Sequence, residues 1–143
     1  PTWSPDGRSV LVVSDRMGGP QIFRMSASGG AMSRLPTNIS GYVTEPDWNP
    51  RTNDLVIFTF ATGGTFQLGL YDFSANSTTV LTTGPGDSVE ARWLNDGRHI
   101  VFTRKQGRER SLWLLDTETK RSARISPQNV REPRHPDFVY PSR

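Results

Sequence analysis

The sequence predicts an all-β chain built from three tandem copies of one four-stranded repeat. A tryptophan recurs at intervals of 45 residues, at Trp3, Trp48 and Trp93. Apolar residues alternate or run in short blocks, without helical spacing, and Gly or Pro interrupts them about every 8–12 residues. The residues that surround each tryptophan also agree between the copies, and chance rarely produces agreement at so many positions.

The three copies align on their turns and strands. Copy one opens with Pro-Thr-Trp-Ser-Pro-Asp-Gly-Arg and copy three with Ala-Arg-Trp-Leu-Asn-Asp-Gly-Arg. Copy two has Pro-Asp-Trp-Asn-Pro and then one more turn residue. An apolar block follows each turn, at residues 10–12, 56–58 and 100–102. The copies close with Arg34-Leu35, Val80-Leu81 and Arg124-Ile125.

Each copy is expected to form four short strands, and copy one shows the pattern. Its first strand covers Pro1–Ser4 and ends at a turn in which Pro5 fixes φ and Gly7 supplies a positive φ. The elements expected to follow are a β-branched strand at Arg8–Asp15, a hairpin turn at Met17–Pro20, a strand at Gln21–Ser26, a glycine turn at Ser28–Gly30 and a last strand at Met32–Pro36.

Four strands in about 45 residues are typical of one blade of a β-propeller. The predicted blades lie at about residues 1–37, 45–84 and 90–126. The three tryptophans are expected to be core residues that fill the wedge between neighbouring sheets. Asp6-Gly7 and Asp96-Gly97 are expected to be turn residues and not metal ligands.

Closed propellers have about 4–8 blades, so three blades are expected to form half of a six-bladed ring. Residues 127–143 are expected to add one orphan closing strand and a tail, in which either Glu132–Pro136 or Pro136–Phe138 repeats the tryptophan motif. Because blades bury their apolar faces only against other blades, this chain is expected to self-associate or to need further blades.

Composition excludes several classes of site and partner. The chain has no cysteine, which excludes disulfides and thiolate metal sites. No apolar run approaches the roughly 18 residues of a membrane-spanning helix. The net charge is +3, but acidic and basic residues interleave in the basic last third, so no nucleic-acid partner is expected.

No catalytic motif is present, and the chain is expected not to be an enzyme. It has no Gly-x-Ser-x-Gly elbow, no His-Glu-x-x-His and no phosphate-binding glycine loop. Its two histidines are His99 and His135, and His99 is expected at the surface beside a turn.

The carboxylates Glu45 and Glu90 form the first candidate site. Each stands three residues before a tryptophan, at the start of a predicted innermost strand, and Glu132 is their possible counterpart in the tail. At the mouth of a propeller channel they would suit a basic partner residue or a cation such as calcium, the one metal or cofactor considered. The alternative is that they pair with Arg92, Arg131 or Arg134, or are solvated.

The second candidate site consists of loop residues at the blade ends, where propellers bind partners. These residues are Asp15, Arg16, Tyr42, Arg104 and Lys105.

The repeat resembles the TolB-type propeller repeat over nearly the whole chain. The resemblance rests on Trp-Ser-Pro-Asp-Gly-Arg, on Ser14-Asp15-Arg16 with Pro20-Gln21-Ile22-Phe23, on Glu45-Pro46-Asp47-Trp48, and on Leu114-Leu115-Asp116-Thr117. It fits the last three blades of six. The tail departs from the pattern, because His135 or Phe138 stands where tryptophan is expected.

The resemblance implies a periplasmic, non-enzymatic hub of the Tol-Pal system that binds the lipoprotein Pal and supports the outer membrane. Similar blades also occur in the propellers of prolyl-oligopeptidase-like serine peptidases, so a gating propeller of such an enzyme is the alternative. A sugar- or cation-binding, lectin-like propeller is a third option.

Overall fold

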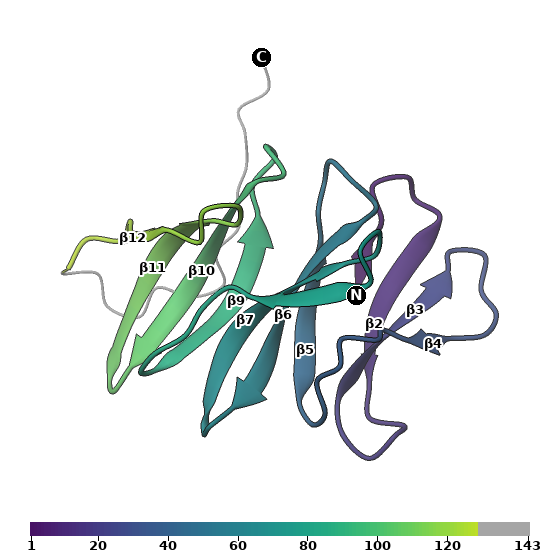
Figure 1. The fold of residues 1–143 in the computed structure, drawn as a ribbon, viewed down its shortest axis with the longest axis horizontal. Coiled ribbons are helices and arrows are strands. Elements are labelled where there is room, and N and C mark those ends of the chain that lie inside the picture. The colour runs from purple at the N-terminus through teal and green to yellow at the C-terminus, as the bar shows by residue number, and fades with distance from the viewer. Residues whose placement is uncertain (129–143) are drawn as a thin grey trace.

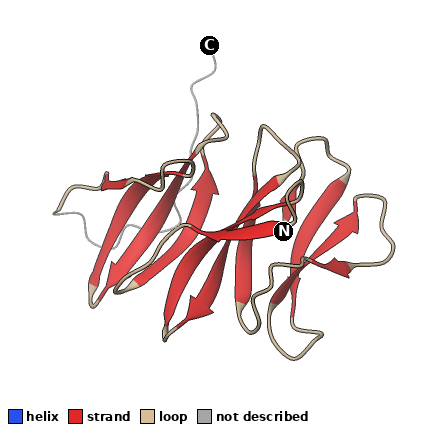
Figure 2. Cartoon of the chain, in the orientation of Figure 1, coloured by secondary structure: helices blue, strands red, loops and turns tan. Residues whose placement is uncertain are grey.

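The computed structural model describes residues 1–128. This part of the chain contains no helix (Figure 2). It forms three separate four-stranded sheets, and every strand pair is antiparallel. The sheets lie side by side in chain order (Figure 1). The prediction of three four-stranded antiparallel blades is therefore confirmed, and we call the sheets blades 1, 2 and 3.

The strands follow one another in chain order within every blade, so the first strand lies at one edge and the fourth at the other. Blade 1 consists of β1 (Thr2–Trp3), β2 (Ser9–Ser14), β3 (Gln21–Ser26) and β4 (Ser33–Arg34). Blade 2 consists of β5 (Val43–Trp48), β6 (Leu55–Thr62), β7 (Thr65–Asp72) and β8 (Ser77–Val80). Blade 3 consists of β9 (Asp87–Trp93), β10 (His99–Gln106), β11 (Glu109–Asp116) and β12 (Ser122–Arg124).

The Asp-Gly turns join the first two strands of blades 1 and 3, as the sequence predicts. Asp6 Oδ1 accepts a hydrogen bond from the main-chain N–H of Arg8 at 2.9 Å, and Asp96 Oδ1 accepts one from Arg98 at 2.9 Å. The glycine between them has a φ of 71° at Gly7 and 70° at Gly97, a conformation that suits glycine. Both carboxylates therefore shape turns.

The joint between blades 1 and 2 is the first of two apolar cores. Leu11 and Ile22 of blade 1 pack in one cluster with Trp48, Phe58 and Tyr71 of blade 2. All five side chains are buried. Removal of this apolar surface from water holds the two sheets together.

The joint between blades 2 and 3 repeats this arrangement with the opposite face of blade 2. Ile57 and Leu68 lie in one cluster with Trp93, Ile100 and Phe102 of blade 3. Since successive side chains of a strand point to opposite faces, Ile57 and Phe58 serve different joints. The middle blade is thus covered on both faces.

The three tryptophans differ in burial. Trp48 is 4% exposed and Trp93 is 6% exposed, because the blade before each of them covers its ring. Trp3 is 57% exposed, so the prediction that it is a core residue is wrong in this structure. Within residues 1–128 no blade lies on the outer side of blade 1. The tail residues Glu132, His135 and Phe138, and most of the predicted closing strand at 127–143, lie outside the described residues.

Candidate functional site

Glu45 and Glu90 each occupy a β-bulge in the first strand of a blade. The pairing of β5 with β6 shifts between Thr44 and Asp47, and the pairing of β9 with β10 shifts at the same position of the repeat. Glu45 has a φ of 52° and Glu90 a φ of 59°, in the left-handed region that non-glycine residues rarely adopt. The bulge re-aims both side chains.

The Glu45 carboxylate links blade 2 to blade 3. Its Oε2 accepts a hydrogen bond from Thr59 Oγ1 at 2.6 Å and one from the main-chain N–H of Glu90 at 3.0 Å. Glu90 Oε2 likewise accepts from Thr103 Oγ1, at 2.9 Å. Within residues 1–128 no arginine forms an ion pair with Glu45. Arg131 and Arg134, two of the arginines considered from the sequence, lie outside the described residues. The structural role of Glu45 is to satisfy a donor of the next blade.

Sequence reasoning missed the threonine partners, although a signal for them exists. Thr59 and Thr103 stand at matching positions of the second strand in copies two and three, the copies that contain the glutamates. Copy one has Val13 there, and its glutamate position falls before Pro1. The glutamate and the threonine thus occur together in the repeat.

The residue before each tryptophan makes a second link between blades. Thr2 Oγ1 accepts a hydrogen bond from the main-chain N–H of Trp48 at 3.1 Å. Asp47 Oδ2 accepts one from the main-chain N–H of Trp93 at 2.8 Å, and the Asp47 carbonyl accepts from Trp93 Nε1 at 3.0 Å. Arg92 occupies this position in blade 3 and has no acceptor on its side chain.

A metal site at Glu45 and Glu90 would need further ligands beside them. Within residues 1–128 no group of three or more His, Asp or Glu side chains is placed to hold a metal ion. The channel cation stays a prediction.

Replacement of Glu45 by alanine is expected to lower the free energy of unfolding by about 2 kcal/mol, because it leaves the Glu90 N–H and the Thr59 hydroxyl without their charged acceptor. Glu45→Gln keeps an acceptor oxygen and should lose less than half as much. Urea unfolding measures both variants. An unchanged Glu45→Ala stability, together with loss of a calcium-dependent rise in Tm, would instead favour the cation site.

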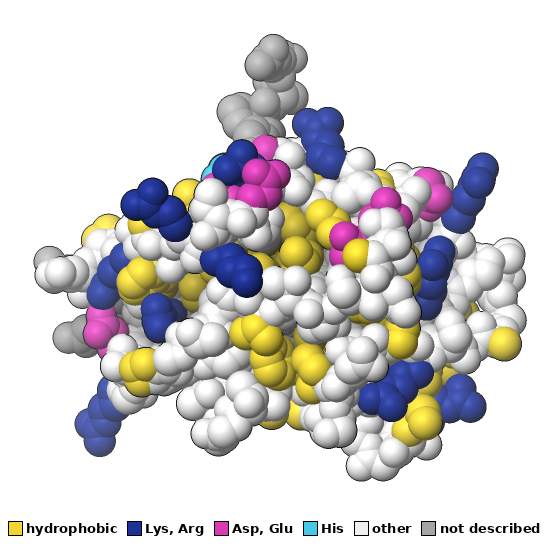
Figure 3. Space-filling view, in the orientation of Figure 1, with side chains coloured by type: hydrophobic (Ala, Val, Ile, Leu, Met, Phe, Trp, Pro, Cys, Tyr) yellow, Lys and Arg dark blue, Asp and Glu magenta, His cyan; other side chains and the backbone are white. Residues whose placement is uncertain are grey.

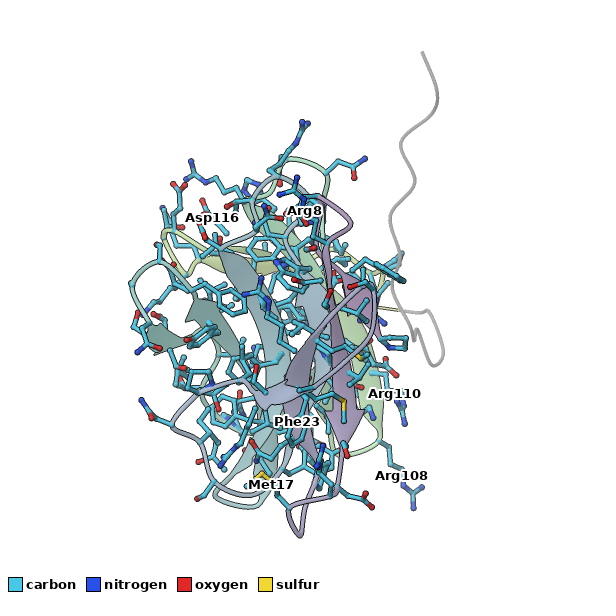
Figure 4. All side chains as sticks on the ribbon, turned by 90° about the vertical axis from the view of Figure 1, so that its right-hand side faces the viewer. Arg8, Met17, Phe23, Arg108, Arg110 and Asp116 are labelled. Carbon is cyan, nitrogen blue, oxygen red and sulfur yellow. The ribbon has the colours of Figure 1, made fainter. Side chains whose placement is uncertain are left out.

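The loop residues of the second candidate site lie on different blades. Arg16 lies with its guanidinium carbon 5.8 Å from the centre of the Phe23 ring. Tyr42 is 40% exposed, and its ring centre lies 5.1 Å from that of Phe66 on β7. The labelled side chains Met17 and Arg108, at the tips of the β2–β3 and β10–β11 hairpins, reach the same end of the molecule (Figure 4). Asp15 and Arg16 belong to the first of these hairpins. Arg104 and Lys105 lie near the end of β10.

A charged cluster lies at the opposite end, where Figure 4 places Arg8 and Asp116. Arg98 donates to both carboxylate oxygens of Asp116, at 3.1 Å from Nε and 2.7 Å from Nη2. His99 is partly exposed and its Nδ1 lies 2.6 Å from Asp96 Oδ2, close to the surface position expected from the sequence. The hydrogen bonds from Arg98, helped by the main-chain N–H groups of Glu118 and Thr119, hold the pKa of Asp116 well below its usual range.

This lowered pKa makes the Arg98–Asp116 pair a source of pH-dependent stability. A carboxylate whose folded pKa is depressed contributes stability above its unfolded value of 3.8 and loses that contribution as pH falls through the folded pKa. Arg98→Gln should therefore destabilise the protein at pH 6 and lose less stability than the parent between pH 4 and pH 2. Arg8 stands at the matching position of blade 1 and forms no ion pair within residues 1–128. Because the main-chain N–H of residue 8 still donates to Asp6 in Arg8→Gln, this variant should change the profile far less than Arg98→Gln. Parallel profiles for all three proteins in urea unfolding would contradict this.

The blades of this chain are similar to those of known TolB propellers. The chain matches the model of the TolB beta propeller domain over residues 1–137. It belongs to the TolB β-propeller family. TolB of Acinetobacter baumannii superposes with a TM-score of 0.77 at 26% identity, over 92% of this chain and 33% of that one. The Tol-Pal system protein TolB of Anaeromyxobacter dehalogenans is 30% identical over 95 residues, which are 65% of this chain and 21% of that protein.

The chain is also similar to a protein described as a peptidase and shares its fold with a hydrolase. A protein of Bacillus subtilis described as the uncharacterized peptidase YuxL is 40% identical over 58 residues, 40% of this chain and 9% of that protein. Puromycin hydrolase shares the fold with a TM-score of 0.64 at 21% identity, over 89% of this chain and 21% of that one. The chain spans a third or less of each of these four proteins.

Among the described residues no helix could cross a membrane.

Proposed function

We propose that this chain is part of a non-enzymatic, protein-binding propeller of the TolB type. The observation that carries the proposal is the similarity to TolB of Acinetobacter baumannii, which covers 92% of the chain. The carboxylates of the first strands support the non-enzymatic part of this proposal. Glu45 and Asp47 of β5 accept hydrogen bonds from main-chain N–H groups of blade 3. We infer that they are structural groups and not catalytic ones.

The proposed partner is a Pal-like lipoprotein, and the proposed compartment is the periplasm. Both come from the similarity to Tol-Pal system proteins. The proposed binding residues lie in loops at the blade ends, with the exposed ring of Tyr42 and the cations Arg16 and Arg104 as contacts. Exposed aromatic and arginine side chains contribute most to binding at many protein interfaces.

Calorimetry with the complete protein and the Pal lipoprotein of the same organism tests this proposal. Saturable binding is expected, and Tyr42→Ala should weaken it about tenfold, a loss of about 1.4 kcal/mol. Lys120→Ala, a charge removed at the other end of blade 3, is the control and should change little. Absence of Pal binding by the complete, folded protein would refute the proposal.

A gating propeller of a serine peptidase is the second candidate, favoured by the similarity to YuxL. The two candidates differ in the domain that accompanies the propeller. A hydrolase domain with Gly-x-Ser-x-Gly downstream would favour the peptidase, whereas an α/β domain upstream would favour TolB. Sequencing of the gene on both sides of residues 1–143 decides between them.

We also expect residues 1–143 alone to self-associate, since Trp3 leaves apolar surface exposed on the outer face of blade 1. Analytical ultracentrifugation should show species heavier than the 16.0 kDa chain at micromolar concentration. Trp3→Ser should shift the distribution toward the monomer. A parent chain that stays monomeric would contradict the expectation.

A further inference from the structure

A pocket of about 240 Å³ lies in blade 3, near the turn that joins β10 to β11. Strand register places its lining on one face of the blade. Arg104 pairs with Ser111, Gln106 with Glu109, and Trp113 with Arg124, so these side chains stand together on the face toward blade 2. Lys105 pairs with Arg110 and stands on the opposite face.

Arg104 is the unengaged cation of this pocket. Its guanidinium carbon lies 5.1 Å from the centre of the Trp113 ring. Trp113 is itself fixed, since its Nε1 donates to Ser111 Oγ at 2.9 Å. Within residues 1–128 the Arg104 guanidinium has no hydrogen bond or ion pair. A guanidinium that lies over an aromatic ring keeps N–H donors available to bind an anion.

Arg124, the second arginine of the pocket, is paired with a carboxylate. Its Nη1 lies 2.6 Å from Oε1 of Glu109, a carboxylate on the exposed end of β11. Arg124 Nε also donates to the Ser126 carbonyl at 3.2 Å, which holds the side chain in place. The Glu109 carboxylate is therefore paired with Arg124. Arg104, the other arginine of the pocket, lies over the Trp113 ring and has no anionic partner within residues 1–128.

We propose that this pocket binds a carboxylate side chain of an acidic segment of a partner protein, with Arg104 as the recognising cation. The inference rests on the proposed protein-binding function. Arg108 at the hairpin tip adds a cation outside the pocket (Figure 4). On the side where β10 and β11 lie, Lys and Arg side chains are scattered and do not form a continuous stripe (Figure 3). A single-carboxylate pocket fits this pattern better than the phosphate track that a nucleic acid needs.

Anisotropy of a fluorescein-labelled Glu-Gly peptide, titrated with the complete protein, tests the inference. Arg104→Gln should weaken binding about tenfold, as expected for loss of one charge-assisted pair. Arg110→Gln removes the same charge from the opposite face of the hairpin, and we expect less than about a twofold change. Equal losses in the two variants would show general charge attraction and overturn the inference.

Glu109→Gln provides a test by gain of affinity. It frees Arg124, so the acidic peptide should bind about threefold or more tightly. Glu118→Gln gives the same change of net charge at the other end of blade 3 and should not. A Gln-Gly peptide should not bind. Competition by inorganic phosphate or a single-stranded oligonucleotide at the same Arg104-dependent site, with equal strength, would overturn the assignment to a protein carboxylate.

Pal binding separates this inference from the proposed function. If the complete protein binds Pal but not the acidic peptide, the inference fails and the proposed function stands. If it binds the peptide in an Arg104-dependent way but not Pal, the pocket stands and the Pal assignment fails. Thermal unfolding of each variant confirms that the compared proteins are folded.

Discussion

Trp93→Ala is expected to lower the free energy of unfolding by about 3–5 kcal/mol, the cost of removing a large buried aromatic side chain. The ring lies in the core between blades 2 and 3, and its Nε1 donates to the Asp47 carbonyl. Truncation leaves a cavity at this joint and an acceptor without its donor. Equilibrium unfolding in urea measures the loss, with a midpoint shift and little change in m.

Trp3→Ala is the matched control for this prediction. Trp3 stands at the same position of the repeat but is mostly exposed, so under conditions that keep the chain monomeric its loss should cost less than about 0.5 kcal/mol. Comparable losses at Trp3 and Trp93 would mean that the outer face of blade 1 is covered in solution.

Gly69→Ala is expected to destabilise the protein by about 3 kcal/mol. Gly69 pairs with Phe58 across β6 and β7, and a Cβ on Gly69 would stand 2.5 Å from Cζ of that ring. Phe58 is fully buried between blades 1 and 2, so the ring has no space into which to move. Glycine is needed here because the aromatic ring lies against its main chain, not because of an unusual φ.

Gly19→Ala is the control, because a Cβ there meets only the Gly41 carbonyl oxygen at 4.0 Å. It should be neutral or slightly stabilising, through a smaller entropy of the unfolded chain. Phe58→Leu should restore part of the stability in the Gly69→Ala background. A Gly69→Ala protein as stable as the parent would show that the ring can move. Thermal unfolding of the three variants and the parent protein checks this.

The first strand of each blade shows how far the candidate site was predictable. The spacing of Glu45 and Glu90 before the tryptophans marks them as special, and the structure finds both at bulges with a positive φ. The partner in the next blade was not predictable from spacing, because Glu90 lies 45 residues from Glu45 and its N–H meets that carboxylate only when two sheets pack. The Arg104 pocket is similar, since its residues come from three strands that the register brings to one face.

The sequence by itself determined the repeat, the four strands of each copy and the Asp-Gly turns, because these depend on residues close together in the chain. Only the tertiary structure decided which tryptophans are buried. Trp3, Trp48 and Trp93 are the same residue in the same local setting, yet a ring is buried only where another blade lies against it. Packing between blades likewise decided that the Glu45 carboxylate binds the next blade, whereas the Arg104 guanidinium stays available to a partner.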